Sequence, residues 1–318
     1  QILKWNNTNS KWYPGNVEEE EVSTGGTQKA IFAFGENENM ATNTTLHISS
    51  TGTAQRGTYG IGTARTGLAA AGYGGDKAIF GFGNSWNSYN DVNGSNLNLT
   101  NLVSNTGNVA TDSTGVGTAR TGLAASGYGG DKAIFGFGNA SSLQNITNLV
   151  SNIGVVATDT TGVGTARKDL AAAGYGEGKA IFGFGNTSSL QNITNLVSNT
   201  GVVSTDTTGV GTARSGSAAA GYGGDKAIFG FGYATSYTNT TNLVSNLGVV
   251  ATDTTGVGTA RKSLGASSYG GDKALFALGY NTSGRVSTIN FVSNTGVVAT
   301  DGSTVNPDTV YQQGQAKH

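Results

Sequence analysis

Apolar and polar positions alternate along this chain in short runs, and one run recurs six times. The run Lys-Ala-Ile-Phe-x-Phe-Gly, or a close variant, begins at Lys29, Lys77, Lys132, Lys179, Lys226 and Lys273, with spacings of 48, 55, 47, 47 and 47 residues. Alternation with a period of two predicts strands, and no segment shows the 3.6-residue period of a helix. Repeats of about 40 to 50 residues predict units that stack or close into a ring to bury their apolar faces.

The unit that spans residues 214–260 predicts four short strands separated by turns: 217–222, 226–232, 241–245 and 249–252. The first has small side chains that suit a crowded inner position, and a Gly-Gly-Asp turn follows it. In the second, Ala227, Phe229 and Phe231 fall on one face, and Ile228 and Gly230 on the other. Both faces are largely apolar, as expected where neighbouring units pack on either side.

Six such units predict an all-β fold, a closed six-bladed β-propeller of four-stranded antiparallel blades. An open β-solenoid is the main alternative, but its coils are usually much shorter than these units. We divide the chain into an N-terminal hairpin (1–16), the propeller (17–301) and a C-terminal tail (302–318). The inner strand of the first unit comes either from residues 17–24 or from the tail, and the sequence leaves both open.

Composition narrows the functional classes. The chain has 36% hydrophobic and 12% charged residues, and no apolar run approaches the roughly 18 residues of a membrane-spanning helix, so we expect no membrane insertion. A formal net charge of -1 offers no electrostatic footprint for nucleic acid. The absence of cysteine excludes disulfides, thiolate metal sites and cysteine nucleophiles.

The order of features within a unit resembles the kelch family. Ala-Arg, a small-residue strand, a Gly-rich turn, an aromatic strand ending in Gly, a variable stretch and a hairpin follow one another over residues 29–301. The family's Gly-Gly doublet is Phe-Gly here, as at Phe82-Gly83, and its late Trp is a Val such as Val203. The resemblance implies a kelch-like propeller, and the departures argue against an intracellular kelch-type adaptor.

The N-terminal segment predicts a two-stranded hairpin, because Ile2-Leu3-Lys4-Trp5 and Lys11-Trp12-Tyr13 flank residues 6–10. Its Leu-Lys-Trp-Asn-x-x-x-x-Lys-Trp pattern resembles short elements of phage tail and fibre proteins, and the repeats resemble those of viral structural proteins. The resemblance implies a location on a virion surface or outside cells, with Trp5, Trp12 and Tyr13 attaching the chain to other virion or fibre subunits. The alternative is a hairpin that packs on the side of the propeller.

Catalytic chemistry is poorly supported. His47 and His318 are the only histidines, and neither belongs to the repeated unit. The copper site of galactose oxidase, which shares the kelch-type propeller, needs a Tyr-Cys link that this chain cannot form. The run Glu18 to Glu21 reads as solvated charge more readily than as a calcium site. We therefore expect no enzymatic activity, no cofactor and no bound metal.

A repeated Asp and Arg, eight residues apart, form the sharpest polar pattern. The pairs are Asp112 with Arg120, Asp159 with Arg167, Asp206 with Arg214, and Asp253 with Arg261. They could ring one end of a central channel and bind an anion or a sugar. The interpretation we favour is structural: each Asp caps its own Thr-Thr-Gly or Ser-Thr-Gly turn, while each Arg ties neighbouring units together.

The link between second and third strands varies from unit to unit, and such loops are where binding residues tend to lie. The candidates are Trp86, Tyr89, Asn90, Tyr233, Tyr237, Tyr280 and Arg285. Aromatic and hydrogen-bonding side chains suit a host-surface carbohydrate or protein. Neutral variation in exposed loops is the alternative. A receptor-binding display protein is our first hypothesis. The others are a structural capsid or fibre subunit that contacts copies of itself, and a secreted lectin-like or kelch-type interaction propeller.

Overall fold

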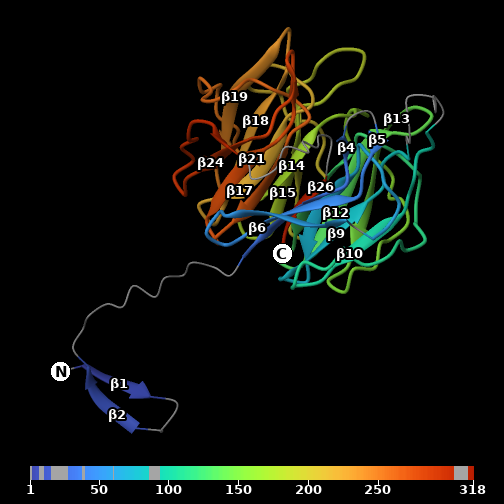
Figure 1. Cartoon of the computed structure of the whole chain (residues 1–318). Coiled ribbons are helices and arrows are strands. Elements are labelled where there is room, and N and C mark those ends of the chain that lie inside the picture. The colour runs from blue at the N-terminus through green and yellow to red at the C-terminus, as the bar shows by residue number, and fades with distance from the viewer. Residues whose placement is uncertain are drawn as a thin grey trace.

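The computed structural model describes residues 2–6, 11–15, 28–37, 40–59, 61–85, 94–303 and 314–318. Within these ranges every regular element is a β-strand, as the alternating pattern predicts (Figure 1). No helix in the described ranges is long and apolar enough to cross a membrane. The fold is all-β and consists of small antiparallel sheets.

Six of these sheets have three or four strands, one for each repeat. In the order of their pairing they are sheet 1, β26 (Gly314–Lys317), β3 (Ala30–Ala33), β6 (Thr44–Ile48) and β7 (Ala54–Tyr59); sheet 2, β8 (Ala69–Tyr73), β9 (Lys77–Gly81) and β10 (Thr100–Val103); sheet 3, β11 (Ala124–Tyr128), β12 (Lys132–Asn139) and β13 (Leu143–Val150); sheet 4, β14 (Ala171–Tyr175), β15 (Lys179–Gly183) and β16 (Thr194–Val197); sheet 5, β17 (Ala218–Tyr222), β18 (Lys226–Tyr233) and β19 (Tyr237–Val244); and sheet 6, β20 (Gly265–Tyr269), β21 (Lys273–Ala277), β24 (Thr288–Val292) and β25 (Gly302–Ser303).

Three further sheets are two-stranded hairpins: β1 (Ile2–Asn6) with β2 (Lys11–Gly15), β4 (Glu36–Asn37) with β5 (Met40–Ala41), and β22 (Tyr280–Asn281) with β23 (Gly284–Arg285). The first of them is the hairpin predicted at the N-terminus, in which Trp5 lies opposite Trp12.

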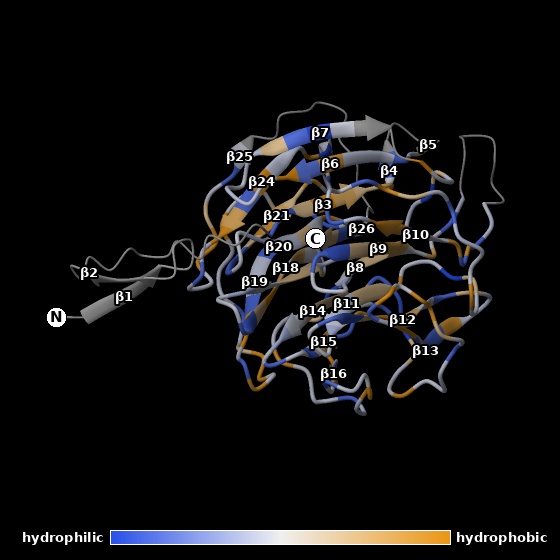
Figure 2. Cartoon of the chain, turned by 90° about the horizontal axis from the view of Figure 1, so that it is seen from below, coloured by the Kyte–Doolittle hydropathy of each residue, from blue (hydrophilic) through white to orange (hydrophobic). Residues whose placement is uncertain are grey.

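The six larger sheets follow one another around a common axis. Their inner strands contact in the order β8, β11, β14, β17, β20 and β26, and β26 contacts β8 again, so the arrangement is propeller-like. Figure 2 shows β26 between β3 and β9, with the C-terminus near the centre of the molecule. The tail therefore supplies the inner strand of the first repeat, which decides between the two alternatives that the sequence leaves open.

The fourth strand predicted at 249–252 is wrong as a regular strand. In sheet 5 the chain makes only isolated bridges there, between Val244 and Val250 and between Thr241 and Thr254. Between those bridges the side-chain amide of Asn242 donates to the carbonyl of Ala251 at 3.0 Å. A side chain thus replaces part of the backbone ladder, and sheets 2 to 5 have three strands rather than four.

The predicted face of Phe231 is also wrong. The pairing register shifts between Gly230 and Gly232, and Phe231 has a φ of 62°, in the left-handed region that non-glycine residues rarely adopt. This turn moves the ring to the face of Ile228, away from Phe229. The equivalent residues share the conformation, with φ between 63° and 65°: Phe34, Phe82, Phe137, Phe184 and Leu278.

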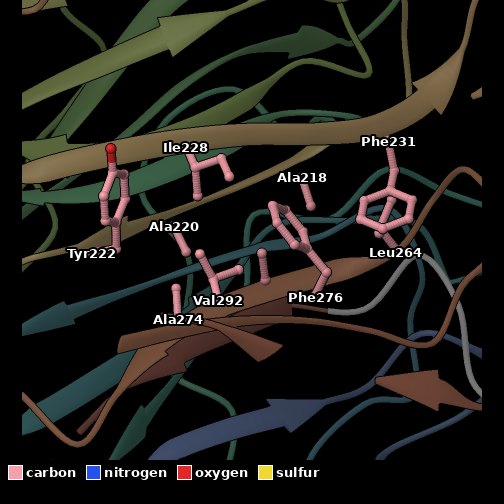
Figure 3. Packing of buried hydrophobic residues seen from close by; sticks show 10 residues of the cluster. Ala218, Ala220, Tyr222, Ile228, Phe231, Leu264, Ala274, Phe276 and Val292 are labelled. Atoms are coloured by element: carbon pink, nitrogen blue, oxygen red, sulfur yellow. The ribbon is translucent and has the colours of Figure 1, made fainter. Parts of the chain in front are cut away.

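Apolar clusters between neighbouring sheets form the core. In Figure 3, Ile228 and Phe231 of sheet 5 pack against Leu264 and Phe276, which belong to the next repeat. The sheets approach so closely that a Cβ atom on Gly230 would lie 2.7 Å from Cζ of Phe276. The Gly between the two aromatic residues of the repeat is therefore a packing requirement of the interface between sheets.

Ring closure brings the two histidines together, with the ring centroids of His47 and His318 6.4 Å apart. Burial, and then the charge of Lys29, lowers the pKa of His47. Burial, and then the charge of His47, lowers the pKa of His318. Both folded-state pKa values thus lie below the unfolded value of about 6.5, so the unfolded chain binds more protons as the pH falls through that value.

We expect the chain to lose stability between about pH 7 and pH 5, because protonation of these histidines favours unfolding. The aspartates that face the buried arginines, among them Asp112, Asp206 and Asp301, have lowered pKa values and titrate below this window. Melting temperatures measured at pH 7.5 and pH 5 check this. His47→Asn should flatten the dependence, and a wild-type melting temperature that is constant across the window would contradict the expectation.

Candidate functional site

Each repeat from the second onward carries a buried arginine, and Arg167 shows its environment. The side chain is fully buried, and its guanidinium carbon lies 4.3 Å from the ring centroid of Phe137 in the preceding sheet. Nε donates to the carbonyl of Phe184 at 2.8 Å, Nη1 to that of Thr165 at 3.0 Å, and Nη2 to Oδ1 of Asn195 at 2.7 Å. One side chain therefore joins two neighbouring sheets by stacking and hydrogen bonds.

The carboxylate of Asp206 completes this arrangement, with Oδ1 3.9 Å from Nη1 of Arg167. It accepts hydrogen bonds from the backbone N–H and the hydroxyl of Thr165, and from the amide of Asn195. Burial alone raises the pKa of Asp206, but these hydrogen bonds and the charge of Arg167 hold it below its ordinary value. Burial lowers the pKa of Arg167 to about 10, so the guanidinium remains charged at neutral pH.

The Asp and Arg that stand eight residues apart in the sequence belong to different ion pairs. Each aspartate pairs with the arginine that precedes the inner strand of its own sheet. The ion pairs are Arg65 with Asp112, Arg120 with Asp159, Arg167 with Asp206, and Arg214 with Asp253. In the last repeat, Arg261 interacts in the same way with Asp301, which the sequence pattern missed.

The aspartates also cap a different turn from the one expected. Their partners are the threonines of the Gly-Thr-Ala-Arg segment at the start of the same sheet, as for Thr118 with Asp159. The arginines contact a stacked ring and internal acceptors, and none of them lines either of the two axial cavities described below. This network therefore fits the structural interpretation rather than the binding one.

Three tyrosines from the candidate list lie together on one end of the ring. The ring centroids of Tyr233 and Tyr237 are 5.4 Å apart, and those of Tyr237 and Tyr280 are 6.4 Å apart. The ammonium group of Lys262 lies 5.3 Å from the centroid of Tyr233 and 5.9 Å from that of Tyr237. We call these four residues the aromatic patch. Its members come from two neighbouring repeats.

Backbone pairing in two neighbouring sheets positions the side chains of the aromatic patch. Tyr233 ends β18 and Tyr237 begins β19, so one hairpin presents both rings. Lys262 and Tyr280 exchange backbone hydrogen bonds at 2.9 Å, which holds the ammonium beside the hairpin of sheet 5. Arg285 lies opposite Tyr280 in the β22–β23 pair. Tyr233 is 37% exposed, so this edge of the patch faces solvent.

Sequence reasoning missed Lys262, although the signal was available. It follows the buried Arg261, at the position that Thr66, Thr121, Lys168 and Ser215 occupy in the other repeats. Of the remaining candidates, Trp86, Tyr89 and Asn90 lie outside the described residues. Trp5, Trp12 and Tyr13 lie in the paired strands β1 and β2, and their role in attachment stays a prediction.

Two cavities lie along the axis, one at each end of the inner strands. The first, of about 320 Å³, opens at the end that carries the aromatic patch, and it is lined by small residues and four leucines, with Lys168, Asp169 and Gln315. Burial raises the pKa of Asp169, and the charges of Lys168 and Lys262 oppose this. The second cavity, of about 280 Å³, opens at the end of the Gly-Gly-Asp-Lys turns. We call these ends the patch end and the turn end.

No group of three or more His, Cys, Asp or Glu residues within the described ranges could hold a metal ion. No family model and no curated protein matches the chain. Among solved structures, the structure of YjhT is similar, with a TM-score of 0.60 over 84% of this chain and 96% of that chain. The sequence identity is 11%, so the likeness shows a shared fold and says nothing about function.

Proposed function

We propose that the chain is a six-bladed, kelch-like propeller, closed by its C-terminal strand, which works as a non-enzymatic binding module. Six repeats, six sheets of three or four strands and the continuous order of contacts between inner strands support this arrangement. Because a buried arginine fixes each of the first five repeats to the next, the scaffold holds its surface residues in constant relative positions. Such rigidity favours recognition by side chains that need no ordering on binding.

The observation that carries the binding proposal is the aromatic patch. Tyrosine rings stack on the apolar faces of sugars and protein side chains, and their hydroxyl groups form hydrogen bonds. Lys262 adds a positive charge beside two of the rings. The patch therefore suits a host-surface carbohydrate, and a protein surface with similar groups is the related alternative.

We propose a virion or other extracellular surface as the setting, with the β1–β2 hairpin joining the chain to neighbouring virion or fibre subunits. Support comes from the Trp-containing pattern of the hairpin and from the paired strands that present it. Several copies on one particle would raise avidity, because each further contact forms at high effective concentration. Weak single sites would then suffice for attachment.

Replacing Tyr237 with alanine should weaken binding to a glycan selected on an array by about tenfold or more, because the central ring of the patch contributes about 2 kcal/mol or more when it is a hot spot. Surface plasmon resonance with the chain immobilised measures the change. Thr235→Ala is the matched control, since Thr235 is exposed in the same hairpin turn. Equal affinities of the Tyr237→Ala variant and the wild type, or the lack of any array signal, would contradict the proposal.

A second candidate function, a structural subunit that contacts copies of itself, is favoured by a different observation. Aliphatic side chains near the turn end are strongly exposed, among them Ile153 at 73%, Leu247 at 75% and Val297 at 67%. Exposed apolar groups repeated around a rim suit an interface between copies. Sedimentation at rising concentration distinguishes the two candidates, because a self-contacting subunit associates without any glycan.

A further inference from the structure

The closing strand β26 differs from the other inner strands at two positions that line the axis. The residue opposite the first Phe of each repeat is alanine in the other five sheets, namely Ala70, Ala125, Ala172, Ala219 and Ala266. In β26 it is Gln315. Two residues later the other strands have Gly72, Gly127, Gly174, Gly221 and Ser268, whereas β26 has Lys317. At these two positions, therefore, only β26 places long polar side chains, Gln315 and Lys317, beside the axis.

The cavity at the turn end collects positive charge. Its lining contains four lysines, Lys132, Lys179, Lys226 and Lys317, and no aspartate or glutamate among the described residues. A cleft lined by one sign of charge concentrates the field and attracts ions of the opposite sign. With a volume of about 280 Å³, the cavity suits a small molecule.

Two of these lysines already have carboxylate neighbours at the rim. Nζ of Lys132 lies 3.5 Å from Oδ1 of Asp131, and Nζ of Lys226 lies 3.2 Å from Oδ1 of Asp225. Lys179 follows Gly178, which replaces the aspartate of the repeat, and neither Lys179 nor Lys317 forms an ion pair with any described residue. Burial lowers the pKa of Lys317, yet the residue stays exposed to solvent, so a ligand can reach it and it has no counter-charge among the described residues.

The same cavity also presents acceptors without donors. Oε1 of Gln315 and Oε1 of Gln28 are buried without a hydrogen-bond partner, and both side chains line the cavity. A buried polar atom without a partner is costly, and a ligand that brings a hydroxyl donor removes the cost. The lysine ammonium groups suit an anionic group of a ligand, and the glutamine oxygens suit hydroxyl donors of the same ligand.

We propose that the axial cavity at the turn end binds a small hydroxylated carboxylate, whose charge pairs with Lys317 and Lys179 and whose hydroxyl groups donate to Gln315 and Gln28. The site is separate from the aromatic patch, which lies at the other end, and it does not depend on the function proposed for that patch. The asymmetry of β26 gives the ring one orientation for the ligand, because at the positions of Gln315 and Lys317 the other inner strands have only alanine, glycine or serine.

Isothermal titration of the full chain with gluconate and with sorbitol, a neutral polyol of similar size, tests the proposal. We expect gluconate to bind and sorbitol to bind at least about tenfold more weakly, because the carboxylate makes the charged contacts. Lys317→Gln should weaken gluconate binding by about tenfold or more, and Lys179→Gln should weaken it less. Lys77→Gln, at the matching position of the second repeat, where the lysine does not line the cavity, is the matched control and should leave gluconate binding unchanged.

Failure to bind gluconate at millimolar concentration, or equal binding by the Lys317→Gln variant and the wild type, would overturn the proposal. Equal binding of gluconate and sorbitol would also overturn it, because the lysines would then contribute nothing. Thermal melting of each variant checks that the ring remains folded. Since glycan binding at the aromatic patch is measured with Tyr237→Ala, the failure of either site can be told from the failure of the other.

Discussion

Replacing Arg167 with alanine should lower the free energy of unfolding by about 3–5 kcal/mol, because each buried acceptor left without its donor costs about 1–3 kcal/mol. The variant leaves Oδ1 of Asn195 and the carbonyl of Phe184 without their donors, and it leaves a gap over the ring of Phe137. Each loss lies at the junction of two sheets. The damage should therefore affect the whole ring rather than one loop.

Urea denaturation, followed by far-ultraviolet circular dichroism, measures the effect as a shift in the urea concentration at the midpoint of unfolding. Arg167→Lys should be nearly as damaging, because an ammonium group cannot reproduce the planar fork that reaches three acceptors. Lys168→Ala is the control at the next position, where the side chain is 40% exposed, and it should change stability by less than about 0.5 kcal/mol. A small effect for Arg167→Ala would show that the arginine contacts do not hold the sheets together.

Deleting residues 314–318 should destabilise the chain by about 3 kcal/mol or more, because it removes the inner strand of sheet 1. Ala316 packs in a cluster with Ile31, Phe34 and Phe80, and the deletion exposes these side chains. Full burial of one large apolar side chain contributes roughly 1.5–3 kcal/mol. The deletion also leaves the backbone of β3 unpaired on its inner side.

Thermal and urea denaturation of the truncated chain measure this loss. The double variant Gln315→Ala and Lys317→Ala is the control, since it keeps the backbone of β26 while removing the side chains that line the axis. We expect the control to retain wild-type stability within about 0.5 kcal/mol. A truncated chain as stable as the wild type would mean that β26 adds nothing to the ring.

Much of the fold could be predicted from the sequence because the repeat states its pattern six times. The inner and second strands of each sheet follow from small residues before a Gly-rich turn and from the aromatic run after it. The face of Phe231 could not be predicted, since alternation assumes an extended backbone and this residue is left-handed. The prediction of a fourth strand was wrong because the side chain of Asn242 donates a hydrogen bond to Ala251 where we expected backbone pairing.

The candidate sites show a similar division. Tyr233, Tyr237 and Tyr280 were recognised from the variable loops, and the structure brings them together. The partners of the aspartates were not recognised, because the nearest arginine in the sequence belongs to the next sheet, while the ion pair joins the two edges of one sheet. Gln315 and Lys317 can be recognised as residues beside the axis only once the pairing of β26 with β3 is known. No local pattern in the tail reveals that position.

A cross-link between Ala30→Cys and Lys317→Cys tests ring closure most directly. The two residues lie opposite each other, next to a pair in which Lys29 and His318 exchange backbone hydrogen bonds, so their Cα atoms belong to a closely spaced pair of about 4.5 Å. That distance suits a disulfide, and the chain has no cysteine of its own. Closure through β26 predicts an intramolecular disulfide on mild oxidation, seen by mass spectrometry of the monomer. A chain that stays reduced, or that forms only disulfide-linked dimers, would contradict it.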